Sequence, residues 1–302
     1  MPRIYLYSPA GAIRDRTAFQ RGVRRLKALG YEVEVDEAAL ARHQRFAGDD
    51  ATRLAALRRA AASGADLAMI SRGGYGLTRI LADLPYKALA KAIEGGTRFV
   101  GLSDFTALQC AVLARTQAPT WAGPALMDDF AAPEPGDEIT LACLEDLATG
   151  RGEGTGWCLP ASEAGHWTVR KAIVWGGNLS VLCALVGTPY LPSVEGGILF
   201  IEDVNEHPYR IERMLSQLLH AGVLAQQKAI LFGQFSNYRL VAHDRGFKLS
   251  SVVDWLRTRV RARVLTGLPF GHVATKVVLP VGRLCDLVVQ ERQALLLWGA
   301  DA

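Results

Sequence analysis

Three residues of this chain, Ser103, Glu202 and His272, are of the types that together carry out nucleophilic catalysis. In such a relay a serine hydroxyl attacks the substrate, a histidine takes its proton, and a carboxylate holds the histidine in place. The chain order, serine then acid then histidine, is one of the known orders of this relay. Many chains contain such a trio, so each residue has to be judged by its local setting.

Ser103 lies between the apolar run Phe99–Leu102 and a helical pattern that begins at Asp104. A residue between a parallel strand and the next helix faces the edge of the sheet where ligands bind. The backbone N–H groups at the helix start can stabilise an oxyanion. However, the sequence Gly-Leu-Ser-Asp is not the G-x-S-x-G pattern, and serine is also a common helix cap. Both interpretations stay open at this point.

The segment Arg72–Gly76 (RGGYG) follows another apolar run. Adjacent glycines let the backbone approach a ligand closely and offer N–H donors. A nucleotide site is not indicated, because neither G-x-G-x-x-G nor G-K-[ST] is present. A plain tight turn explains the segment equally well.

The acidic segment Ile201–Pro208 (IEDVNEHP) allows a metal site, because it offers carboxylates and a histidine. Asp203 and Glu206 also suit the start of the helix that follows, and Pro208 suits its first turn. Glu202 differs because it ends an apolar strand, where a carboxylate needs a partner.

His272 has the most informative setting of the six histidines, because the segment Leu268–His272 (LPFGH) places it on a glycine-bounded loop next to a strand. This setting allows a catalytic base, although a satisfied surface histidine is the commoner case, so both interpretations stay open. His207 competes for the same role. The remaining histidines lack such a setting; they are His43, His166, His220 and His243.

Two groups of elements are expected to position these residues. In residues 1–125, apolar runs alternate with helical patterns, which is typical of parallel β-α-β units and a Rossmann-like parallel sheet. Its strands are expected at Arg3–Ser8, Tyr31–Val35, Asp66–Ser71, Thr97–Leu102 and Thr120–Gly123, and its main helices at Arg16–Leu29, Ala51–Ala62 and Asp104–Ala114.

Residues 126–160 read as a connection, because segments rich in Pro and Gly flank a single helix, Glu138–Leu147. From 161 to 302, short strands with Gly and Pro turns predict a smaller α+β C-terminal domain with a mixed sheet. Strands are expected at Thr168–Val174, Gly197–Ile201, Lys228–Phe235, Lys276–Val278 and Asp286–Gln290, and helices at Asn178–Leu185, Pro208–His220 and Ser251–Val260.

The composition fits two folded domains. The 302 residues are 50% hydrophobic and 21% charged, which allows packed cores and excludes wholesale disorder. Lys and Arg total 34 against 30 Asp and Glu, and this dispersed net charge of +4 is not the basic footprint of a nucleic-acid-binding protein.

The five cysteines are isolated from one another and fit neither a disulfide framework nor a zinc site, so we expect buried thiols. The first residues lack the pattern of a signal peptide, and no apolar stretch is long enough to span a membrane. We therefore expect a cytoplasmic protein with neither a membrane nor a nucleic-acid partner.

Five blocks of sequence, in order along the chain, resemble the LD-carboxypeptidases, the serine hydrolases of peptidase family S66. They are RGGYG at 72–76, GLSDFTAL at 101–108, GGNLSVL at 176–182, ILFIEDVNEHPYRIERML at 198–215 and GH at 271–272. The resemblance runs from the first strand to about Gly282. Leu102 stands where an aromatic residue is usual and Asn205 where glycine is common, but neither departure touches the three candidate residues.

The resemblance implies a cytoplasmic serine carboxypeptidase of peptidoglycan recycling that needs no metal or cofactor and commonly forms a homodimer. Such an enzyme removes the terminal D-alanine of a small murein tetrapeptide by cutting an L,D bond. Ser103 would be its nucleophile, Glu202 its acid and His272 its base, at a cleft between the domains. The backbone N–H groups of Gly74 and Asp104 would form the oxyanion hole.

Two other functions stay open. A microcin-immunity-type relative would use the same three residues on a peptidyl-nucleotide or an acyl-sulfamoyl conjugate, and Trp175 is a candidate platform for its nucleobase. A non-catalytic ligand-binding module of two α/β lobes would need no reactive serine.

Overall fold

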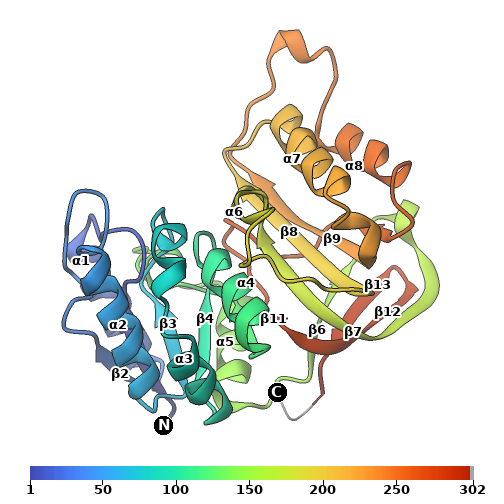
Figure 1. The fold of residues 1–302 in the computed structure, drawn as a ribbon. Helices are drawn as coiled ribbons and strands as arrows, with labels where there is room; N and C mark the ends of the chain where they lie inside the picture. The colour runs from blue at the N-terminus through green and yellow to red at the C-terminus, as the bar shows by residue number, and fades with distance from the viewer. Residues whose placement is uncertain (300–302) are drawn as a thin grey trace.

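Two β-sheets organise the chain, and the computed structural model describes residues 1–299 of it (Figure 1). The first sheet has the strand order β11-β5-β4-β3-β1-β2. Its first five strands along the chain run parallel, and β11 is antiparallel to β5. The bounds are β1 Arg3–Tyr7, β2 Glu32–Val35, β3 Leu67–Ile70, β4 Arg98–Gly101, β5 Thr120–Ala122 and β11 Leu279–Val281.

Helices cover both faces of this sheet, which explains why β3 and β5 are buried along their whole length. These helices are α1 Arg16–Ala28, α2 Asp50–Ala62, α3 Tyr86–Glu94, α4 Phe105–Thr116 and α5 Glu138–Thr149, with a short π-helix at Leu126–Phe130. Helix α4 is buried from Phe105 to Leu113 because it lies between the two sheets and contacts α6 and β7 of the second one.

The second sheet has the strand order β10-β9-β8-β7-β12-β13-β6. Strands β7 to β10 run parallel to one another, whereas β12 pairs antiparallel with both β7 and β13, and β13 pairs antiparallel with β6, so the sheet is mixed. The strands are β6 Gly154–Cys158, β7 Gly165–Asn178, β8 Gly197–Val204, β9 Gln227–Ser236, β10 Arg263–Leu265, β12 Arg283–Glu291 and β13 Gln293–Leu297, and the helices are α6 Leu179–Leu185, α7 Pro208–His220 and α8 Leu249–Arg257.

The predicted fold class, a Rossmann-like parallel sheet followed by an α+β part with a mixed sheet, is confirmed. The expectation that the second sheet is the smaller one is wrong, because within residues 1–299 it has seven strands against six. Strand β6 lies in the expected connection and pairs with β13, and neither β10 nor β13 was predicted. These short strands depend on their sheet neighbours, which local sequence does not reveal. The boundaries at 125 and 160 stay a prediction.

The strand expected at Lys276–Val278 is also wrong, because the strand begins at Leu279 and joins the first sheet. The backbone N–H of Lys276 donates to Oγ1 of Thr140, 2.8 Å away, and that of Val277 donates to the carbonyl of Pro269. These groups are therefore paired with a helix and a loop instead of a strand.

Candidate active site

Ser103 occupies the turn between β4 and α4 with a backbone φ of +66°. This left-handed conformation is unfavourable for a residue with a Cβ by roughly 1–2 kcal/mol, so the surrounding structure has to impose it. The space is tight. A Cβ added at Gly73 would lie 2.7 Å from Cβ of Ser103 and 2.9 Å from its Oγ. The first glycine of the RGGYG segment is thus required by close approach to the serine, and the segment is more than a plain turn.

The alternative in which Ser103 caps helix α4 is wrong. The N-cap residue of α4 is Asp104, and no side chain donates or accepts a capping hydrogen bond there. Within residues 1–299 the Ser103 hydroxyl makes no hydrogen bond to another protein group, and its side chain is only partly buried. The hydroxyl is therefore available to a ligand.

Asp104 ties the RGGYG segment to the start of α4. Its buried carboxylate accepts the backbone N–H of Leu77 at 2.8 Å and that of Gly76. Burial raises the pKa of Asp104 to about 6, although these two hydrogen bonds and the charges of Arg53 and Arg45 act in the opposite direction.

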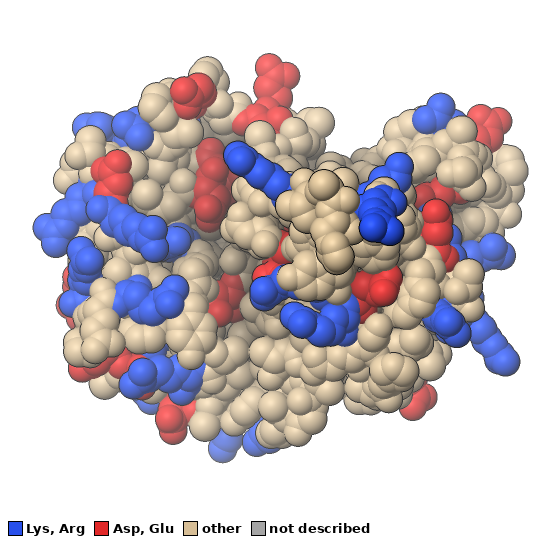
Figure 2. Space-filling model, turned by 90° about the horizontal axis from the view of Figure 1, so that it is seen from above, with Lys and Arg blue, Asp and Glu red and all other residues tan. Residues whose placement is uncertain are grey.

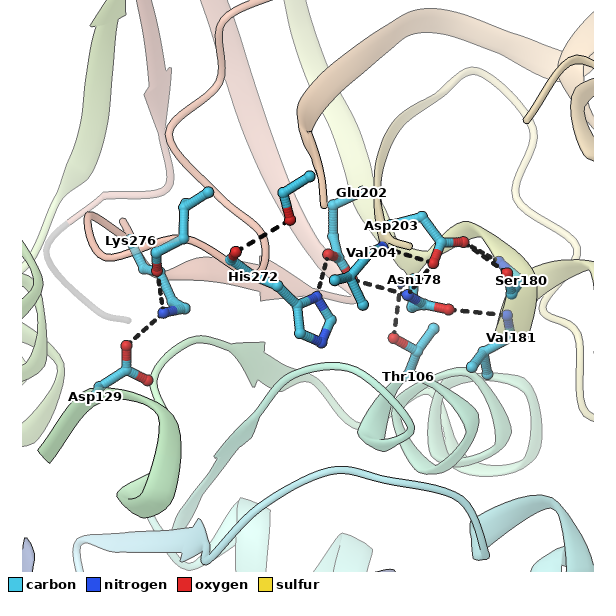
Figure 3. A network of polar contacts seen from close by, with 12 residues as sticks. Thr106, Asp129, Asn178, Ser180, Val181, Glu202, Asp203, Val204, His272 and Lys276 are labelled. Carbon is cyan, nitrogen blue, oxygen red and sulfur yellow. Dashed lines mark hydrogen bonds and ion pairs between the residues drawn. The ribbon is translucent and has the colours of Figure 1, made fainter. Parts of the chain in front are cut away.

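Glu202 lies near the end of β8 and is fully buried. Oε2 of Glu202 lies 2.8 Å from Nδ1 of His272, and Oε1 accepts a hydrogen bond from Nδ2 of Asn178 at 3.2 Å. A Cβ at Gly271, which has a φ of +142°, would lie 3.3 Å from Cβ of Glu202. The glycine beside His272 therefore lets its loop approach the carboxylate closely. Figure 3 shows the His272 ring hydrogen-bonded to Glu202.

The imidazole of His272 is oriented by Glu202. Burial acts to lower the pKa of His272, but the hydrogen bond and the charge of Glu202 outweigh it, so the pKa is raised above its ordinary value. A carboxylate only accepts hydrogen bonds, so Nδ1 carries the proton and Nε2 of the neutral ring is a free base. The side chain of His272 is 20% exposed, so Nε2 can meet a ligand.

Hydrogen bonds join this pair to the helix that begins beside Ser103. The backbone N–H of Asn178 donates to Oγ1 of Thr106 in the first turn of α4, 3.0 Å away, and its side chain donates to Glu202 (Figure 3). Sequence reasoning missed both Asn178 and Thr106 as functional candidates, although each lies in a block that carries the family resemblance. Asn178 also caps α6, because its side chain accepts the backbone N–H of Val181.

The other members of the acidic segment are dispersed. Asp203 accepts hydrogen bonds from the backbone and hydroxyl of Ser180, so it serves the start of α6 instead of α7. Glu206 pairs with Arg210, and Nε2 of His207 lies 3.1 Å from Oδ2 of Asp244. His207 is therefore not part of the Glu202–His272 pair.

A buried ion pair holds the loop that carries His272. The ammonium group of Lys276 contacts Asp129 of the π-helix and donates to the carbonyl of Val273, and both charged side chains are 2% exposed (Figure 3). Burial raises the pKa of Asp129 to about 6, although Lys276 opposes this shift. Sequence reasoning missed this pair, because its residues are 147 positions apart.

Three further features of residues 1–299 bear on other chemistry, namely possible metal ligands, the cysteines and membrane-spanning helices. No group of three or more His, Cys, Asp or Glu side chains in that range is arranged to hold a metal ion. All five cysteines are free. Cys110, Cys183 and Cys285 are buried as expected, Cys143 is half-buried, and Cys158 is exposed, so the expectation of buried thiols is wrong for Cys158. No helix in the same range is long and apolar enough to cross a membrane.

A partly exposed serine in a strained strand-to-helix turn, together with a histidine held by a buried glutamate, supplies the components that serine hydrolases use. Comparison with known proteins defines the family. Residues 4–123 match the model of the LD-carboxypeptidase N-terminal domain, and residues 171–287 match that of the C-terminal domain. The chain therefore belongs to the LD-carboxypeptidase family, as the sequence blocks indicate, and it is an enzyme of the carboxypeptidase class.

Individual relatives align with most of the chain. A probable murein peptide carboxypeptidase of Bacillus subtilis is 30% identical over 90% of this chain and 84% of its own length. The crystal structure of muramoyltetrapeptide carboxypeptidase from Oxalobacter formigenes superposes with a TM-score of 0.87 at 38% identity and covers 97% of both chains. The microcin C7 self-immunity protein MccF of Escherichia coli is 27% identical over 71% of this chain and 68% of its own length. A non-catalytic two-lobe binding module is excluded by this family membership.

Proposed function

We propose that this protein is a cytoplasmic serine LD-carboxypeptidase that releases the terminal D-alanine from murein tetrapeptides during peptidoglycan recycling. The observation that carries the proposal is the Glu202–His272 pair, in which Nδ1 of His272 lies 2.8 Å from Oε2 of Glu202. Hydrogen bonds through Asn178 connect this pair to the helix that begins beside Ser103. The substrate class is supported by the names of two relatives. The alignment with this chain covers more than four fifths of the length of each.

In the proposed reaction, Nε2 of His272 takes the proton of the Ser103 hydroxyl as Oγ attacks the carbonyl carbon of the L,D bond. Glu202 holds the imidazole in the tautomer with the proton on Nδ1 and stabilises the cation that forms. The cation then protonates the amine of D-alanine as the bond to the acyl group breaks. Water hydrolyses the acyl-enzyme, releases the tripeptide and restores the serine.

The backbone N–H groups of Gly74 and Asp104 are proposed as the oxyanion hole. Within residues 1–299 neither N–H donates to a protein acceptor, and both flank the contact between Gly73 and Ser103. Donors of this kind stabilise the negative charge that develops on the carbonyl oxygen, and loss of one typically lowers kcat by about 10²–10³-fold.

A microcin-immunity-type activity on peptidyl-nucleotide or acyl-sulfamoyl conjugates is the second candidate, since MccF is a relative. Its expected aromatic platform is not available here. Trp175 is 1% exposed, and its Nε1–H donates to Oε1 of Gln227 at 3.0 Å, so the ring cannot stack on a nucleobase. The murein peptide is therefore the preferred substrate class.

The deciding experiment incubates wild type and Ser103→Ala with L-Ala-γ-D-Glu-meso-diaminopimelate-D-Ala and quantifies free D-alanine. We expect release by wild type and a fall of about 10³-fold or more in the variant, with an unchanged melting temperature. Turnover of the variant within tenfold of wild type would exclude Ser103 as nucleophile. No release by either protein, with Ser103 still labelled by a fluorophosphonate probe, would favour the second candidate.

We also propose a homodimer, in keeping with the family resemblance. Light scattering of the purified protein tests it, and a molar mass near 32.7 kDa would contradict it.

A further inference from the structure

The first sheet has a topological switch point between β1 and β3. The chain leaves β1 toward β2 on one side and later returns to β3 on the other, which gives the local order β2-β1-β3. In open α/β sheets, the loops after two such strands diverge and leave a crevice that commonly binds a ligand. The ends of the two strands are held together here, since Oγ of Ser8 lies 2.5 Å from Oγ of Ser71.

A cavity of about 370 Å³ lies at this point, lined by the segments that follow β1, β2 and β3. Its lining includes four arginines and no acidic residue; the arginines are Arg14, Arg42, Arg45 and Arg72. We call it the arginine pocket. Figure 2 views the molecule from above the orientation of Figure 1 and shows several Lys and Arg side chains over the left-hand part, where the N-terminal elements lie.

The charges of the arginine pocket are not neutralised by the protein. Within residues 1–299, none of its four guanidinium groups forms an ion pair with a carboxylate. The half-buried Arg72 donates to the carbonyl of Ala12 at 3.1 Å, and the guanidinium of Arg45 lies 5.5 Å from the ring centre of Tyr75. Like charges gathered in one cavity repel each other, so the pocket favours an anion, and the planar fork of arginine matches a carboxylate.

The pocket adjoins Ser103. Gly73 contacts Ser103, and the next residue, Gly74, lines the pocket. The charge of Arg45 also reaches Asp104, where it acts to lower the pKa of that carboxyl. In a carboxypeptidase substrate, the free carboxylate lies one residue from the bond that is cut, a span of at most about 3.6 Å. The pocket wall at Gly74 lies one residue from the Gly73–Ser103 contact, which is consistent with this short span.

We propose that the arginine pocket binds the free C-terminal carboxylate of the substrate, with Arg45 and Arg72 as its principal donors. The assignment rests on the proposed function, because it takes Ser103 as the nucleophile. Binding of this carboxylate in the pocket would explain why the enzyme removes a terminal residue and does not cut within a peptide. A C-terminal amide keeps the same bond but loses the charge, so it is the matched substrate.

The test measures kcat/KM for the tetrapeptide and for its C-terminal amide in wild type, Arg45→Gln and Arg72→Gln. Arg213→Gln, an exposed arginine on α7, is the control. We expect kcat/KM of wild type to be at least 100-fold higher for the acid than for the amide. Each pocket variant should lose at least 10-fold in kcat/KM for the acid and less than 3-fold for the amide. The control should match wild type. Arg45 is exposed, so its variant keeps the test valid if Arg72→Gln fails to fold.

If turnover of the amide is too slow to measure, binding is measured instead. Calorimetry then gives the affinities of the tetrapeptide and of its amide for Ser103→Ala and for Ser103→Ala/Arg45→Gln. Equal losses on acid and amide would overturn the proposal. A loss of affinity in the pocket variants only for peptides that keep the D-glutamate carboxylate would assign the pocket to this upstream carboxylate. That result would also overturn the proposal. If wild type releases no D-alanine at all, the proposed function fails, which is a different outcome.

Discussion

The backbone N–H of Asn178 donates to the hydroxyl of Thr106 across the boundary between the two sheets, at 3.0 Å. Thr106 lies three residues after Ser103 on α4, and the Asn178 side chain donates to Glu202. A Cβ at Gly177 would lie 2.3 Å from the same hydroxyl oxygen, so the backbone meets α4 as closely as it can. This contact fixes the distance between the part of the molecule that carries the serine and the part that carries the Glu–His pair.

Thr106→Val tests this link. The substitution removes the acceptor and leaves a buried N–H of Asn178 without a partner, which costs about 1–3 kcal/mol of stability. We expect the free energy of unfolding to fall by that amount and kcat/KM to fall about tenfold, because Glu202 loses its alignment. Thr116→Val is the control, since that hydroxyl donates to the carbonyl of Val112 and accepts the N–H of Ala118, both at the far end of α4 from Ser103. A loss of stability with unchanged kcat/KM would show that the contact does not position the site.

Gly73→Ala tests the close approach at the serine. The added methyl group would lie 2.7 Å from Cβ of Ser103, so either the RGGYG segment or the serine has to move. A shift of about 1 Å in a reacting group lowers the rate by about 100-fold. We expect a fall of this size in kcat, and a larger loss of kcat than of binding. In the control Gly136→Ala, the new methyl group meets only the flexible side chain of Leu141 at 3.3 Å, and activity should stay within twofold.

The pH dependence of kcat/KM tests His272 as the proposed base. The ring acts as base only when neutral, so activity rises as the pH increases through its pKa, which Glu202 raises above the ordinary value. Glu202→Gln removes the charge and leaves burial, which acts to lower the pKa. We therefore expect the acidic limb of the variant to move to lower pH while its maximal kcat/KM falls by about 10²–10⁴-fold. An unchanged acidic limb would mean that another group controls it.

The strands and helices nearest the site were predictable because their residues carry local signals. The apolar run before Ser103 and the run before Glu202 both predict buried strands, and Ser103 follows the end of β4 while Glu202 lies near the end of β8. The positive φ of Ser103 and the Thr106–Asn178 contact were not predictable, because both depend on groups brought together only by folding. The arginine pocket likewise collects residues from three loops whose proximity follows from strand order, which the sequence does not state.

The buried pair of Lys276 and Asp129 gives the last prediction. Lys276 lies four residues after His272, and its ammonium group also contacts the carbonyl of Val273, so the pair holds the loop that carries the proposed base. Lys276→Met leaves the Asp129 carboxylate buried without its partner, and breaking a buried pair in this way costs about 3–5 kcal/mol. We expect that loss in chemical denaturation, together with a lower kcat, because the loop is no longer fixed. The double variant Lys276→Met/Asp129→Asn removes the unpaired charge and should regain most of the stability while kcat stays low. Recovery of both quantities would show that the pair serves stability alone and does not position His272.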